Sequence, residues 1–125
     1  MKRPVTLTIS AMAFAADGAQ AHHSLAMFDQ EHPIEIAGTV LEFRYTSPHT
    51  FILLNVKDTD GESTVWILEG LSPSSLSRVG ISATTIMPGD GLVLTVDPLR
   101  TGALGGSWSP NKTWWFPDRR PLIKP

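Results

Sequence analysis

The sequence predicts an all-β domain with one short helix, folded as a small OB-like barrel of five antiparallel strands. Two observations support this fold class. Several short segments alternate apolar and polar residues, as half-buried strands do, and helical signals interrupt this pattern only once. The resulting order of three strands, a helix and two strands is the chain order of an OB-type barrel. Closing the sheet removes exposed strand edges, which benefits a chain without disulfides.

The first three predicted strands occupy residues 34–45, 50–57 and 62–69. Gly38 lies inside the long first strand and predicts a bulge or a bend that lets this strand cross two neighbours. The second and third strands form a hairpin, because the turn between them ends at Gly61, a residue suited to a positive φ.

A helix is predicted over residues 73–79. Ser72 is a suitable N-cap, a proline occupies the first helical position, and Gly80 suits the residue just past the end. Leu76 and Val79 are three positions apart, so we expect both to face the core.

The second half of the chain has weaker strand signals. A turn at residues 87–91 precedes a fourth strand at 92–96, and a glycine-rich loop follows. The fifth strand is expected at 107–116, although Pro110 interrupts it. The C-terminal tail after this strand is predicted to be irregular.

The N-terminus resembles a secretory signal peptide covering residues 1–21. A basic start is followed by a mainly apolar stretch at 5–16 and by Ala19-Gln20-Ala21, a small-x-small cleavage site. The apolar stretch is too short to span a bilayer, and no other segment is long enough. We therefore expect a single exported domain, residues 22–125, that is periplasmic or secreted and has no membrane span.

Composition limits the possible partners and ligands. The formal net charge of the 125 residues is −2, and removing the leader makes it more negative, which argues against nucleic acid as a partner. There is no cysteine, so neither a disulfide nor a thiolate nucleophile is available. A metal site would have to use histidine, methionine, carboxylates or the amino terminus.

The positions of the histidines suggest a copper site. Cleavage at the predicted site leaves His22 and His23 as the first two mature residues, and a terminal amine with an imidazole can chelate copper. His49 is the expected third contributor, if Leu25 and Phe28 act as apolar anchors that fold the segment back towards it. Alternatively, the two N-terminal histidines begin a tail and His49 bonds a backbone carbonyl.

A second group of candidate ligand-binding residues contains Trp108, Trp114, Trp115 and Arg100. Aromatic side chains on OB barrels can stack against sugars or aromatic ligands. The simpler interpretation, which we favour, is that these aromatics close one end of the barrel. Arg100 could anchor an anionic ligand or pair locally with Asp97.

Several motifs resemble a family of small exported bacterial proteins of unknown function. They are the H-H-S-x-A-x-F-D pattern at residues 22–29, S-P-H at 47–49, P-G-D at 88–90 and D-P-L-R at 97–100. The resemblance covers about residues 22–108. It implies export but no particular activity.

No nucleophile, metalloprotease or other catalytic motif is present. The leading hypothesis is a non-enzymatic exported barrel that binds a metal ion or small ligand, with copper the first choice. The alternative is an accessory subunit that docks onto an exported redox enzyme through the Trp-rich C-terminal end. A third hypothesis is an enzyme whose N-terminal copper site activates oxygen.

Overall fold

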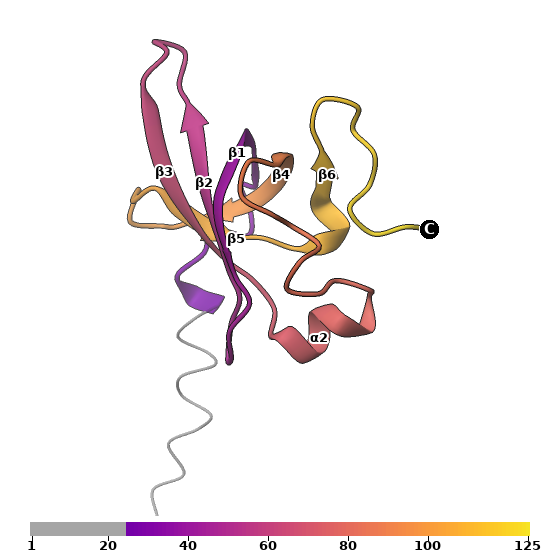
Figure 1. Ribbon diagram of the computed structural model, residues 1–125. Helices are drawn as coiled ribbons and strands as arrows, with labels where there is room; N and C mark the ends of the chain where they lie inside the picture. Colours follow the sequence, from indigo (N-terminus) through magenta and orange to yellow (C-terminus); the bar gives the residue numbers. More distant parts are fainter. Residues whose placement is uncertain (1–24) are drawn as a thin grey trace, which may run out of the picture.

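A computed structural model describes residues 25–125 as a closed, mostly β barrel with a short helix (Figure 1). This confirms the predicted fold class. Strand neighbours follow the order β1-β2-β3-β5-β4, and an additional β1–β4 pairing closes the ring. The predicted signal peptide, His22 and His23 lie outside the described residues. The elements of the barrel are β1 (Ile34–Arg44), β2 (Phe51–Lys57), β3 (Ser63–Glu69), α2 (Pro73–Arg78), β4 (Gly91–Pro98) and β5 (Gly105–Ser107).

The barrel is mixed, whereas the sequence analysis expected only antiparallel pairs. Strands β3 and β5 pair in parallel, and the remaining barrel pairs are antiparallel. The reason is topological. Strand direction cannot alternate all the way round a closed ring with an odd number of strands, so a five-stranded barrel needs one parallel pair.

Strand β1 crosses two neighbours, as predicted. Its first half pairs with β4 and its second half with β2. The shift in register falls between Val40 and Glu42, so the bulge is not at Gly38. Gly38 has a different role, because a Cβ there would lie 2.3 Å from the carbonyl oxygen of Asn55. A side chain at this position would collide with the neighbouring strand.

Helix α2 has the predicted N-terminus. The Ser72 hydroxyl accepts a hydrogen bond from the amide of Ser75 at 3.3 Å, and Gly80 has φ 85° just past the end. Leu76 is fully buried, as expected. Val79 is 42% exposed, which corrects the prediction that it faces the core. The helix ends at Arg78, and Val79 is a C-cap with non-helical backbone angles, so its side chain leaves the buried face.

The predicted fifth strand at 107–116 is two separate strands. Strand β5 ends at Ser107, a 3-10 turn η1 (Pro110–Lys112) follows, and β6 (Thr113–Trp115) pairs with β4 outside the ring. Proline lacks the amide hydrogen of a ladder and favours a helical first turn, which explains the break. The tail forms no further strand but folds back, since the Trp115 amide donates to the carbonyl of Arg120.

The core fills the inside of the ring and extends under α2. Its fully buried members come from the barrel strands and from the segment around the helix. Within residues 25–125, no helix is long and apolar enough to cross a membrane. The largest fully buried side chains are Ile52, Leu54, Leu68, Leu76, Ile81, Ile86, Leu92 and Leu94.

Candidate ligand and metal site

A pocket of about 380 Å³ lies where four segments of the chain meet. Leu25 and Phe28 come from the segment before β1, and His49 comes from the turn before β2. Glu69 ends β3, and Trp108 directly follows β5. The pocket therefore joins parts of the chain that are distant in sequence.

Hydrogen bonds made by the backbone and the hydroxyl of Thr50 fix one wall of this pocket. Its amide and hydroxyl both donate to the carbonyl of Leu71, at 3.1 and 2.7 Å, and its own carbonyl accepts from the amide of Gly70 at 2.8 Å. Thr50 is fully buried, so these bonds are shielded from water. They hold His49, the preceding residue, beside the end of β3.

His49 and Glu69 form the charged part of the pocket. His49 Nε2 lies 3.6 Å from Glu69 Oε1, and the side chains are 44% and 24% exposed. This distance is too long for a hydrogen bond, so the contact is an ion pair only when the imidazole is protonated. One imidazole nitrogen is thus held near a carboxylate in a position that solvent reaches.

Trp108 closes the inner side of the pocket. Its side chain is 3% exposed, and its amide donates to the carbonyl of Glu69 at 2.9 Å. The indole Nε1 is buried and has no hydrogen-bond partner among residues 25–125. A Cβ at Gly70 would lie 2.2 Å from this nitrogen, so only glycine fits opposite the indole ring.

The segment that carries Leu25 and Phe28 is attached to the loop between β4 and β5. The amide of Asp29 donates to the carbonyl of Pro98 at 2.8 Å, and the amide of Arg100 donates to the carbonyl of Met27 at 2.9 Å. Phe28 forms a β-bridge with Leu99 and is buried. These bonds hold the segment against the barrel.

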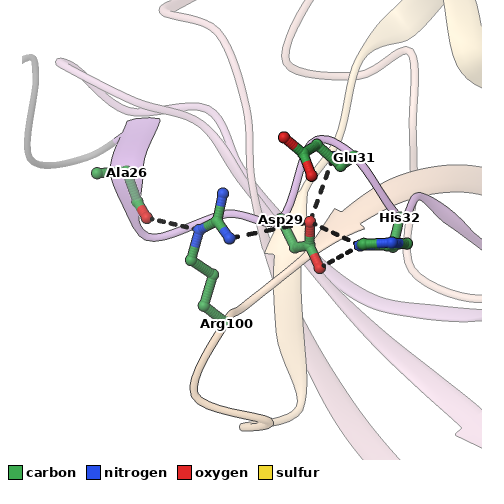
Figure 2. A network of polar contacts seen from close by, with 5 residues as sticks. All are labelled: Ala26, Asp29, Glu31, His32 and Arg100. Carbon is green, nitrogen blue, oxygen red and sulfur yellow. Dashed lines mark hydrogen bonds and ion pairs between the residues drawn. The ribbon is translucent and has the colours of Figure 1, made fainter.

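Side chains strengthen the same attachment (Figure 2). Arg100 Nε donates to the carbonyl of Ala26 at 3.1 Å, and its guanidinium is 4.0 Å from the Asp29 carboxylate. His32 Nδ1 lies 3.0 and 3.2 Å from the two Asp29 oxygens. The hydrogen bond from His32 lowers the pKa of Asp29 below its ordinary value, with a smaller contribution from Arg100.

Of the three predicted copper ligands, the structure describes only His49. His49 lies in the pocket beside Leu25 and Phe28, while His22 and His23 are outside the described residues. Among residues 25–125, no three His, Cys, Asp or Glu side chains gather as a metal group. A metal at His49 would therefore need ligands beyond His49 and Glu69.

The other predicted ligand-binding residues do not form one surface. Trp108 is buried in the pocket wall, whereas Trp114 and Trp115 are half-buried on β6. The side chain of Arg100 contacts Ala26 and Asp29, and in the described chain it pairs with neither Asp97 nor a tryptophan. Glu69 and Gly70 were not predicted as site residues, because their position at a strand end carries no signal of ligand binding.

Together, the closed ring and the pocket at its side define the chain as a small OB-like barrel protein. Its residues 10–108 match a family described as a family of unknown function (DUF6152), and the chain belongs to that family. No curated protein matches the chain, and no solved structure does either. The resemblance to a family of unknown function is thereby confirmed, and the family brings no activity with it.

Proposed function

We propose that the protein is an exported binding protein that holds one copper ion at the mouth of the pocket. The ligands would be the amino terminus created by cleavage before His22, an imidazole of His22 or His23, and His49. The observation that supports this proposal is the shared pocket of His49, Leu25 and Phe28. The chain that follows the two N-terminal histidines thus runs beside His49.

The distance along the chain is short enough for this arrangement. His23 precedes Leu25 by two residues, and two extended residues span at most about 7 Å. Leu25 itself lines the pocket, and the residues after it are held by the bonds to Pro98 and Arg100. An anchored segment restricts where its preceding residues can reach, which lowers the entropic cost of forming a site there.

The available groups suit copper. Neutral imidazoles and an amine are ligands that Cu(II) accepts in a tetragonal arrangement. His49 is accessible to solvent, and Glu69 lies close enough to supply a carboxylate oxygen to the same metal ion. The chain has no cysteine, which argues against a site of the thiolate type.

The test is a Cu(II) titration of exported protein whose N-terminus has been verified by intact mass. We expect one site and at least about tenfold weaker binding in His49→Ala. One extra residue before His22 should weaken binding as well, because the amine moves. His32→Ala is the matched control, since His32 pairs with Asp29 outside the pocket. Equal binding by all of these proteins would refute the proposed site.

A further inference from the structure

A copper ion at the mouth of the pocket would leave its apolar interior unoccupied. Leu25, Phe28, Leu71 and Trp108 make its walls mainly apolar. Its volume of about 380 Å³ is in the range of small-molecule sites, roughly 300–1,000 Å³. A concave apolar site with a few polar groups is the usual form of an organic-ligand site.

One of those polar groups is a hydrogen-bond donor without an acceptor. The indole Nε1 of Trp108 has no partner among residues 25–125, although a buried indole N–H is usually hydrogen-bonded. A Cβ at Gly70 would lie 2.2, 2.5 and 2.9 Å from Nε1, Cε2 and Cδ1. An atom in line with the N–H bond could not be so close to the two carbons, so Gly70 lies over the ring face. The N–H edge therefore meets neither Gly70 nor an acceptor of the described chain.

The second polar group sets the charge of the ligand. Glu69 lines the pocket, and the nearest basic side chain is that of His49 at 3.6 Å, beyond hydrogen-bond range. No lysine or arginine of the described chain lines the pocket. The carboxylate therefore disfavours an anionic ligand. An ammonium cation has no acceptor for the Trp108 N–H, so the two groups together favour a neutral ligand that can both donate and accept a hydrogen bond.

We propose that this pocket binds a neutral, hydroxylated aromatic molecule. A hydroxyl group can accept a hydrogen bond and also donate one, which matches the donor at Trp108 and the acceptor at Glu69. The ring would pack against Phe28 and Leu71. The indole nitrogen is closed to solvent, so the ligand displaces part of the pocket wall to reach it. The proposal does not depend on copper.

The test uses 2-naphthol as probe and nitrogen-15 NMR of the full chain, treated with a chelator to remove metal. We expect saturable binding with a shift of the Trp108 indole signal, while the indole signals of Trp66, Trp114 and Trp115 stay in place. Naphthalene lacks the hydroxyl and should bind about tenfold more weakly without this shift. The anion 2-naphthoate should not bind.

Two substitutions test the location without removing a core residue. Leu71→Trp fills the pocket and should abolish binding, whereas Leu104→Trp adds the same bulk at an exposed site outside the pocket and should not. Glu69→Gln should admit 2-naphthoate. Equal affinities for naphthol and naphthalene, or binding unaffected by Leu71→Trp, would overturn the proposal. Failure of copper binding with naphthol binding retained would refute only the metal site.

Discussion

Arg100 donates a hydrogen bond from Nε to the backbone carbonyl of Ala26 at 3.1 Å, although 74 positions separate the two residues. The bond joins the loop after β4 to the segment that forms one wall of the pocket (Figure 2). It lies beside the backbone bond from the Arg100 amide to Met27. Arg100, which does not line the pocket, thus helps to hold one pocket wall in place.

Arg100→Ala should loosen this wall and leave the barrel intact. We expect faster amide hydrogen exchange and proteolysis at residues 26–29, because the side-chain contacts to Ala26 and Asp29 are lost. The free energy of unfolding should fall by less than about 1 kcal/mol, since the group is largely exposed. Arg44→Ala is the control, because Arg44 pairs only with Glu42 in the described chain. Unchanged exchange at 26–29 would contradict this role.

The Asp29 carboxylate should make the attachment sensitive to acid. The hydrogen bond from His32 lowers the pKa of Asp29 from its ordinary 3.8. A lowered folded-state pKa stabilises the fold above the unfolded pKa, and the stabilisation is lost as pH falls through the folded pKa. The stability difference between the wild type and Asp29→Asn should therefore be present at pH 5 to 6 and vanish on acidification below about 3.8. Denaturant titrations across this range would measure it, and a difference independent of pH would contradict it.

The strands and the helix of the barrel could be predicted because short sequence patterns, namely alternation and capping residues, define them. Alternation predicted three of the strands, and Ser72 predicted the start of α2, whose end lies one residue before the predicted one. The relative direction of neighbouring strands, in contrast, depends on contacts between segments that are distant in sequence. The predicted five-stranded ring already required one parallel pair, but strand patterns do not show that β3 and β5 are the strands that pair in this way.

The candidate site was predictable only where the sequence carried a chemical signature. His49 stood out as a histidine in a turn. Phe28 is buried at the pocket, as an apolar anchor should be, whereas Leu25 lines the pocket but is 61% exposed. Trp108 was grouped with Trp114 and Trp115 because they are near in sequence. A 3-10 turn at Pro110 separates them in space, so Trp108 packs inward instead. The contact of Gly70 with Trp108 depends on tertiary packing, which no motif reports.

Gly38→Ala should be strongly destabilising. The added methyl group would lie 2.3 Å from the Asn55 carbonyl oxygen, a backbone atom that cannot move without distorting β2. Forced overpacking of this kind costs about 1–3 kcal/mol. Gly61→Asn is the control, because that position is open and asparagine tolerates its φ of 80°. Chemical denaturation should give a clearly larger loss for Gly38→Ala, and equal losses would be inconsistent with the close approach of β1 to β2.

The contact between Gly70 and Trp108 predicts coupling between two substitutions. In Gly70→Ala, the new methyl group would lie 2.2 Å from Trp108 Nε1, so the indole or the β3 end must shift, and stability should fall by about 1–3 kcal/mol.

Trp108→Phe removes the indole nitrogen and its five-membered ring, which takes away both the clash and the unpartnered buried donor. The smaller ring leaves a cavity, so this variant alone should also be less stable. In the double variant, however, the Gly70 methyl group occupies part of the space that the indole vacated. The combined loss should therefore be smaller than the sum of the two, with a coupling energy of about 1–2 kcal/mol in a double-mutant cycle. Additive losses would show that the two residues do not meet as the structure places them.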